Sequence, residues 1–366
     1  MKFLILTITA GHGHNQTAKA IHSTIVESGH DALILDAYEY INPVLKESVS
    51  RGYLISTSIS PSVYGKFYRR AEKKDANSIL ISPHDITTAI SARKIRSFIE
   101  SYKPDFIICT HVYAALLVSN LEKKGFDIIT AGIITDFTIH PYWDETNLDY
   151  YILANENLKF KAKAKGLPAE KLVTTGIPIS KKFAHKEKKQ FARYALGLED
   201  KTTVLIMSGS MGFGDVFKTL KNISTLDLNF QIVSICGNNK NLKKKIDKAT
   251  LGKTVYNYGF VDNMDAFMDA ADIVISKPGG LTTSECMAKE LPMIIISPIP
   301  GQEERNRDFL VNYGIALAEN HTVGSDEILY HLLNNPERLE QMKENIRKMK
   351  KPNATQDLIN FLIEKA

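Results

Sequence analysis

Short apolar runs alternate with helix-like stretches along the whole chain. Each run has the length of a buried strand, and polar segments with helical spacing separate one run from the next. Strands that alternate with helices indicate parallel sheets joined by crossover connections. The pattern therefore predicts an α/β protein with strands at 3–8, 32–35, 106–109, 128–134, 150–153 and 172–174, followed by strands at 203–207, 231–235, 254–256, 273–275, 293–296 and 315–317.

The predicted strands form two sets, and each set begins with a strand that leads into a glycine-containing loop. A chain of 366 residues is too long for a single hydrophobic core, so the two sets indicate two Rossmann-like domains. The break lies near Gly176 and Pro178, ahead of a lysine-rich polar run at 181–189. We expect an N-terminal domain at 1–178, a second domain at 179–350, and a C-terminal helix at 351–366 that could pack back on the first domain.

A pair of glycines separates a predicted strand from a predicted helix in the sequence SKPGGLTTSE at 276–285. Backbone N–H groups and the helix dipole attract an anion at such a place, most often phosphate, and glycine permits its close approach. Glu285 lies about one turn into the helix, where it could meet sugar hydroxyls. The following loop, PGQEERN at 300–306, adds polar side chains at helix-face spacing, namely Gln302, Glu303 and Asn306. A tight turn with a capped helix is the alternative for either loop, but two such loops at consecutive strand ends favour a ligand site.

Two more loops of the second domain suit a nucleotide. The sequence MSGSMGFG at 207–214 could form a nest of N–H groups for a diphosphate. Asp215 stands where a P-loop ATPase needs lysine, which excludes that class. The backbone near Phe260 and Val261 could pair with the edge of a planar base. We find no Asp-x-Asp pair and no HExxH motif, so we expect neither a metal nor another cofactor.

The first glycine loop reads GHGHNQ at 11–16. Gln16 replaces the third glycine of a dinucleotide fingerprint, so NAD or FAD is not expected. His14 lies at a predicted helix N-terminus, where the dipole favours a neutral imidazole that could act as a general base. It could equally cap the helix. Asp136 directly follows the buried run 128–134 and could orient the histidine or bind a substrate hydroxyl, with capping as the alternative.

The segment 46–74 combines seven lysines and arginines with two glutamates and several aromatic residues. Such a surface suits an anionic bilayer or single-stranded nucleic acid, and an ordinary solvated helix face is the plain alternative. A net charge of +5 is too weak to imply nucleic acid, so we expect none. Trp143 could pack on a lipid, on a sugar or within its own loop. The residues expected at the membrane or the acceptor are Arg51, Tyr53, Tyr64, Lys66, Phe67, Tyr68, Arg69, Arg70 and Trp143.

Three features predict a cytoplasmic protein whose membrane contact is peripheral. Cys109, Cys236 and Cys286 have no CxxC spacing, which favours a reducing compartment. The first residues run straight into a predicted strand and leave no room for a signal peptide. No stretch approaches the ~18–20 apolar residues of a membrane span.

The order of these motifs resembles a known family. GHGHNQ, ITDFTIHPYW, GIPIS, MSGSMGFG, GFVDNM, SKPGGLTTSE and PGQEERN together resemble the monogalactosyldiacylglycerol synthase and processive diacylglycerol glucosyltransferase family. These are inverting GT-B glycosyltransferases related to the peptidoglycan enzyme that adds N-acetylglucosamine to lipid I. The resemblance spans nearly the whole chain and implies two Rossmann-like domains whose parallel sheets face across a cleft.

The resemblance also implies an activity and a set of residues. A UDP-hexose would donate its sugar to the free hydroxyl of diacylglycerol, with His14 as base, at the inner face of the cell membrane. Gly279, Gly280 and Thr282 would hold the diphosphate, Glu285 would bind the ribose hydroxyls, and the backbone at 260–261 would meet uracil. Gln302, Glu303 and Asn306 would read the hexose hydroxyls. The predicted donor-binding set is Gly13, Ser208, Gly209, Ser210, Phe260, Val261, Gly279, Gly280, Leu281, Thr282, Glu285, Gln302, Glu303 and Asn306.

Three alternatives stay open at this point. A UDP-N-acetylglucosamine 2-epimerase has the same two-domain build, a related transferase could use another lipid-linked acceptor, and a non-catalytic sensor could bind a UDP-sugar without turnover. His12 and Arg305 depart from the family pattern and leave the choice of hexose undecided.

Overall fold

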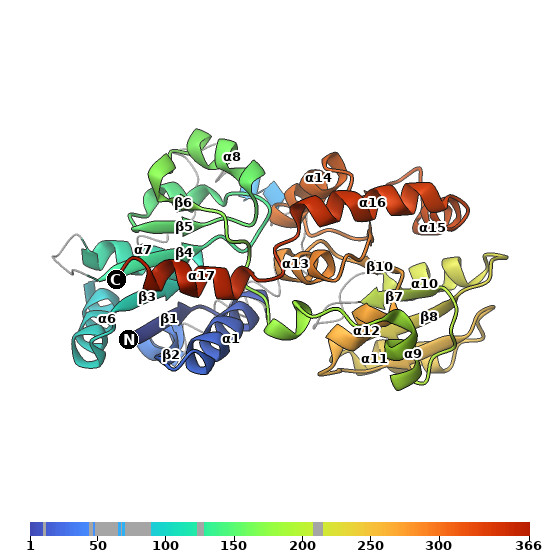
Figure 1. Cartoon of the computed structure of the whole chain (residues 1–366), viewed down its shortest axis with the longest axis horizontal. Coiled ribbons are helices and arrows are strands. Elements are labelled where there is room, and N and C mark those ends of the chain that lie inside the picture. Colours follow the sequence, from blue (N-terminus) through green and yellow to red (C-terminus); the bar gives the residue numbers. More distant parts are fainter. Residues whose placement is uncertain are drawn as a thin grey trace. The chain divides into compact units, whose positions relative to one another are not determined.

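The computed structural model describes residues 1–9, 12–43, 47, 65–66, 68–69, 89–122, 128–207 and 215–366. The chain divides into two compact units, which are treated separately below. Unit 1 contains Met1–Lys181, Pro300–Gln302 and Asn353–Ala366, and unit 2 contains Lys182–Ile299 and Glu303–Pro352 (Figure 1).

Unit 1 is built on a six-stranded sheet with the order β2-β1-β3-β4-β5-β6, in which every pair of neighbours is parallel. Apolar residues fill the central strands because helices cover both faces of a parallel sheet. The strands are β1 (Lys2–Thr7), β2 (Asp31–Asp36), β3 (Phe106–Cys109), β4 (Ile129–Ile133), β5 (Tyr150–Ile152) and β6 (Leu172–Val173).

The helices of unit 1 include the last helix of the chain. In Figure 1 this helix, α17 (Ala354–Ile363), is drawn in red in the same unit as the blue N-terminal strand. Leu358 and Leu362 join a buried cluster with Ile21 and Ile25 of α1, so burial of apolar surface attaches the C-terminus to unit 1. The helical elements before it are α1 (His12–Glu27), α2 (Ala37–Ile41), α6 (Ala89–Tyr102), α7 (Val112–Glu122), η1 (Pro141–Glu145), η2 (Glu156–Leu158), α8 (Lys159–Ala164) and η3 (Ala169–Lys171).

Unit 2 repeats the architecture with a second six-stranded parallel sheet, in the order β12-β11-β10-β7-β8-β9. The strand order turns back at the β7–β10 pair, and ligands of such sheets bind beyond the carboxyl ends of the strands near this point. The strands are β7 (Thr203–Met207), β8 (Gln231–Ile235), β9 (Val255–Tyr258), β10 (Ile273–Ser276), β11 (Met293–Ile295) and β12 (Ala316–Ala318).

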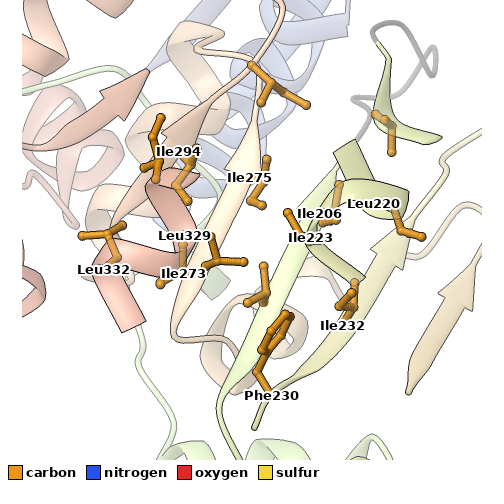
Figure 2. Close-up of a cluster of buried hydrophobic side chains, with 14 of the residues drawn as sticks. Ile206, Leu220, Ile223, Phe230, Ile232, Ile273, Ile275, Ile294, Leu329 and Leu332 are labelled. Atoms are coloured by element: carbon orange, nitrogen blue, oxygen red, sulfur yellow. The ribbon is translucent and has the colours of Figure 1, made fainter. Parts of the chain in front are cut away.

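The core of unit 2 lies between this sheet and helices that include α10 and α15. Figure 2 shows Ile206 and Ile275 of neighbouring strands with Leu220 of α10 and Leu329 of α15, all fully buried. The helical elements of this unit are η4 (Lys181–Phe183), α9 (Lys189–Ala195), α10 (Val216–Ser224), α11 (Lys240–Asp247), α12 (Met264–Ala270), α13 (Gly280–Ala288), α14 (Gln302–Asn312), α15 (Ser325–Leu333) and α16 (Pro336–Met349).

The predicted α/β class is confirmed, and each of the twelve predicted strands is present among the described residues. Most ends agree within one residue. The largest difference is β9, which continues to Tyr258 although the sequence predicted an end at 256. β9 is an edge strand whose residues are all only partly buried, so the polar Asn257 is tolerated within it and hides its length from the sequence pattern.

Candidate functional site

His14 of unit 1 lies in the first turn of α1, beside the residues that follow β3 and β4. Its Nδ1 is 2.6 Å from the carbonyl oxygen of Thr110, the residue after β3. The hydroxyl oxygen of Thr135, which follows β4, lies 3.3 Å from the same nitrogen. The imidazole is therefore held at the carboxyl edge of the sheet, where parallel sheets place their ligands.

The contact with Thr110 decides which nitrogen of His14 carries the proton. A carbonyl oxygen only accepts hydrogen bonds, so Nδ1–H donates and Nε2 keeps its lone pair. Burial lowers the pKa of His14, and the hydrogen bond to Thr110 partly offsets this change. The ring is therefore neutral at pH 7 and ready to accept a proton through Nε2.

Two more histidines lie close to His14 but have the opposite tautomer. The rings of His14 and His111 are 4.5 Å apart between centroids. The Tyr113 N–H donates to Nδ1 of His111 over 3.1 Å, and the Tyr142 N–H donates to Nδ1 of His140 over 3.3 Å. In both neutral rings Nε2 consequently carries the hydrogen and can only donate. Burial, helped by the nearby His14, holds the pKa of His111 well below its ordinary value and lowers that of His140 to about 4.

The sequence reasoning did not identify His111, although one signal was present. His111 follows β3 by two residues, so it lies at the same edge of the sheet as the residue after β1. Asp136 was singled out because it is a polar residue just beyond the end of a buried strand. The same reasoning applies to His111.

A polar bridge fixes the start of the helix that carries His14. Asp36, at the end of β2, accepts from the Thr9 N–H at 3.0 Å and from the Thr9 hydroxyl at 2.6 Å. Asn15 donates to the same Thr9 hydroxyl over 3.0 Å and accepts from the Thr7 hydroxyl over 3.0 Å. These bonds join the end of β1 to the first turn of α1, so the start of the helix has a defined position.

The structure corrects two predicted contacts and leaves a third open. Trp143 is only 4% exposed and lies over Gly132, where an added Cβ would come within 2.6 Å of the indole. Its predicted contact with lipid or sugar is therefore wrong, and the packing alternative holds. Tyr68 is 5% exposed with its ring edge-on to His140, so it offers no surface to a bilayer. Asp136 is half-buried one residue after Thr135, and its role stays a prediction.

Some of the other residues predicted at the membrane or at the diphosphate belong to the described part of the chain, and some do not. Lys66 and Arg69 are described and exposed. The remaining ones lie outside the described residues: Arg51, Tyr53, Tyr64, Phe67, Arg70, Ser208, Gly209 and Ser210.

In unit 2 the glycine pair begins α13 as predicted. Gly279 is the N-cap residue and Gly280 is the first residue of the helix, immediately beyond β10. Gly279 has no side chain that could cap the helix, so the first N–H groups can bind an external acceptor. Thr282 lies in this first turn, and Leu281 next to it is half-buried.

The fold itself does not require glycine at position 279. Its φ of −64° and ψ of 140° are accessible to every residue type. An added Cβ would meet only Glu303, at an ordinary contact distance of 3.9 Å from Oε1. A glycine that neither backbone strain nor packing explains is consistent with a ligand that must approach the backbone closely.

Two residues predicted to read a hexose help to hold this loop together. Asn306 is 0% exposed, and its side-chain amide donates to the Pro278 carbonyl over 2.9 Å. Its predicted contact with a sugar is therefore wrong, because the side chain is enclosed and positions the residue before the glycine pair. Glu303 is buried, accepts from the Ile299 N–H at 2.7 Å and lies 3.5 Å from the Lys277 ammonium. A sugar contact for Glu303, as for Gln302, stays a prediction.

Glu285 lies half-buried on α13. Burial raises the pKa of Glu285 to about 8, with a smaller raise from Asp265 and an opposing effect of Lys182. Hydrogen bonds donated by the hydroxyl groups of a ligand would stabilise a carboxylate that is so poorly solvated. Beyond β9, Phe260 is exposed and Val261 is half-buried, so the peptide between them is accessible from outside unit 2.

Two further findings concern only the described part of the chain. There, no three histidine, cysteine, aspartate or glutamate side chains are grouped so that they could hold a metal ion. None of the helices in the same residues combines the length and the apolar character needed to cross a membrane.

Comparison with known proteins finds a family match for each half of the chain. Residues 14–179 match the family described as monogalactosyldiacylglycerol (MGDG) synthase, and residues 203–358 match the glycosyltransferase family 28 C-terminal domain. The processive diacylglycerol beta-glucosyltransferase of Bacillus pumilus is 30% identical over 371 residues, covering 100% of this chain and 95% of that protein. The enzyme of the same name from Bacillus cytotoxicus is 29% identical, with 99% of this chain and 93% of the relative covered.

Solved structures support the fold. MurG of Acinetobacter baumannii superimposes with a TM-score of 0.68 at 17% identity, covering 100% of this chain and 99% of the other. A UDP-GlcNAc 2-epimerase of Neisseria meningitidis gives 0.61 at 17% identity, with full coverage of both chains. These neighbours confirm the GT-B fold class but do not separate a transferase from an epimerase, whereas the full-length relatives do. The chain belongs to the family of monogalactosyldiacylglycerol synthases and processive diacylglycerol glucosyltransferases, and it is a glycosyltransferase.

Proposed function

We propose that this glycosyltransferase moves a hexose from a UDP-sugar to the free hydroxyl of diacylglycerol, with His14 as general base and with inversion at the anomeric carbon. The supporting observation is the unprotonated Nε2 of His14, which follows from the 2.6 Å contact of Nδ1 with the Thr110 carbonyl. The substrate classes rest on the family, since the relatives carry names that state diacylglycerol as acceptor.

In the proposed reaction, Nε2 of His14 takes the proton of the acceptor hydroxyl. That oxygen attacks the anomeric carbon of the hexose from the face opposite to the diphosphate. The bond between the anomeric carbon and the phosphate oxygen breaks, and UDP leaves with the electron pair. The lowered pKa of His14 allows the imidazolium to release its proton to solvent after each turnover.

The charge of the leaving UDP would be met at the N-terminus of α13. The Gly279–Gly280 turn leaves N–H groups for the diphosphate, and the helix dipole adds to their effect. Glu285 would accept hydrogen bonds from the ribose hydroxyls, and the backbone at Phe260 and Val261 would bind uracil. These assignments need no metal, in line with the absence of an Asp-x-Asp motif from the sequence.

One assay separates this proposal from its alternatives. Purified protein is incubated with diacylglycerol vesicles and UDP-glucose, UDP-galactose or UDP-N-acetylglucosamine, and the anomeric configuration of any glycolipid is determined by NMR. A β-linked product from the α-linked donor is expected, and an α-linked product would refute inversion. An isomeric UDP-sugar formed without acceptor would indicate an epimerase. Binding of the UDP-sugar without any turnover would indicate a sensor. If a product forms only with a polyprenyl-linked sugar or a glycolipid, that lipid is the acceptor and diacylglycerol is not.

We further propose that the enzyme works as a peripheral protein at the inner face of the cell membrane. The exposed Lys66 and Arg69 support a basic contact with anionic lipid. The rest of that predicted surface lies outside the described residues.

A further inference from the structure

Phe160 is 85% exposed, although it belongs to a well-packed part of unit 1. It lies on the short helix α8, whose neighbouring residues Leu158, Ala162 and Leu167 are buried. The buried residues anchor α8 in the core while Phe160 points outward. Its exposure is therefore a property of the folded unit. A single exposed apolar side chain is ordinary on a protein surface, so its significance depends on the charges around it.

Lysines flank Phe160 in the sequence. Between Glu156 and Lys171 the sequence has five lysines and two glutamates, a local charge of five minus two, or +3. Lys159 pairs with Glu156 at 2.9 Å, and Lys163 is exposed one turn from Phe160. An exposed aromatic residue flanked by lysines has the composition of an interfacial membrane contact, in which the ring enters the headgroup region and the charges meet anionic lipid.

This part of α8 adjoins the histidine site. The Lys161 ammonium donates to the Thr138 hydroxyl over 2.9 Å, and Thr138 lies two residues before His140. The charge of Lys165 also contributes to the lowered pKa of His140, which requires the two groups to lie near each other. A membrane bound at α8 would consequently lie next to the cluster that contains His14.

We propose that Phe160, Lys159 and Lys163, here called the α8 surface, insert into and bind an anionic lipid bilayer and thereby bring the histidine site to its acceptor. The idea of a membrane-embedded acceptor rests on the proposed function, while bilayer binding itself can be tested without it. In the sequence, the α8 surface is distinct from the basic segment at 46–74.

The chemistry of the α8 surface favours lipid over other partners. A single-stranded nucleic acid would need several aromatic platforms along a basic groove, and α8 presents one. A stable protein interface would need a broader apolar patch than one ring among lysines. A bilayer needs only one or a few inserted side chains with basic residues around them.

The test measures vesicle flotation of the full-length protein with phosphatidylcholine, alone or mixed with phosphatidylglycerol. Phe160→Ser should weaken binding to the anionic vesicles about tenfold, and Lys163→Gln about fivefold at low salt. Phe191→Ser is the matched control, because Phe191 is 61% exposed on α9 of unit 2 and also lies beside a lysine. Both phenylalanines are exposed, so neither substitution should change the melting temperature.

Three results of the binding measurements would overturn the proposal. The first is vesicle binding by Phe160→Ser that equals the wild type. The second is an equal loss for Phe191→Ser, which would show general stickiness of exposed aromatics. The third is that the protein binds an oligonucleotide through Phe160 and does not bind vesicles.

Activity measurements separate this proposal from the proposed function. Phe160→Ser should keep wild-type turnover on a water-soluble short-chain diacylglycerol and lose turnover on vesicles in proportion to binding. Loss of turnover on the short-chain acceptor as well would assign Phe160 to the reaction site and overturn the docking role. If the wild type glycosylates no diacylglycerol at all, the proposed function fails, while the flotation result still decides whether the α8 surface binds lipid.

Discussion

Replacing His14 by alanine tests the chemical step most directly. The substitution removes the only one of the three clustered imidazoles, His14, His111 and His140, whose Nε2 has a lone pair. It should leave UDP binding intact, because the proposed diphosphate contacts belong to unit 2. The loss of one hydrogen bond to the Thr110 carbonyl should cost about 1 kcal/mol of folding stability, which a folded protein can absorb.

The size of the effect follows from the protonation state. Burial lowers the pKa of His14, so most enzyme molecules carry the active base at pH 7. Removing a positioned general base usually costs 10²–10⁴-fold in rate, so we expect kcat to fall about 10³-fold, or ~4 kcal/mol. For the wild type, kcat/KM should fall as the pH drops through the lowered pKa, below the ordinary 6.5, since protonation removes the lone pair. The variant should lack this inflection.

The assay follows radiolabelled hexose incorporation into diacylglycerol over a range of pH, with UDP affinity measured by calorimetry on the same samples. His111→Ala is the matched control, because its ring lies 4.5 Å from that of His14 while its Nε2 can only donate. We expect the control to lose far less activity and to keep the acidic inflection. A His14→Ala enzyme within tenfold of the wild type, or a His111→Ala enzyme that alone loses the inflection, would refute the assignment of the base.

Three further predictions concern unit 2. Gly279→Ala should leave the melting temperature unchanged, because the backbone angles and the 3.9 Å clearance accept a methyl group. The same substitution should weaken UDP binding about tenfold in calorimetry, because the methyl group would keep the phosphate from the backbone. An unchanged UDP affinity would argue against phosphate at this turn. If the Glu285 carboxylate binds ribose, the affinity for UDP should rise with pH up to the pKa of about 8. Glu285→Gln should remove this pH dependence. The same pH profile in the wild type and the variant would exclude the contact. Burial alone would raise the pKa of Glu290, but Lys186, Lys350 and Arg347, at 2.8, 2.8 and 3.2 Å, outweigh it and lower the pKa to about 2. Glu290→Gln should therefore cost on the order of 1–2 kcal/mol in urea unfolding at pH 7. Because this stabilisation is present above the ordinary value of 4.5 and is lost as the pH falls through about 2, the two unfolding curves should converge in acid, and a gap that persists there would contradict the ion-pair explanation.

Local pattern was sufficient for the fold because the information that makes a buried strand is contained in the strand itself. The run FIIC at 106–109 and the run IVI at 273–275 are apolar on both faces, and only a central strand of a covered sheet accommodates such residues. The same holds for the turn at Gly279 and Gly280, where residue type and position between strand and helix were enough to predict the start of α13. The order of the motifs also carried the family resemblance, which the full-length relatives confirm.

Burial and hydrogen-bond partners, in contrast, depend on residues far away in the chain. Trp143 and Asn306 looked available to a ligand in sequence, but the first is covered by its packing on β4 and the second is enclosed against Pro278, 28 positions away. The tautomer of His14 is set by a backbone carbonyl 96 positions along the chain, a group that every residue has and that no side-chain pattern reveals. Apolar periodicity is a property of neighbouring residues and therefore fixes the strands locally, whereas the protonation and exposure of single groups depend on contacts that exist only once the sheet has formed.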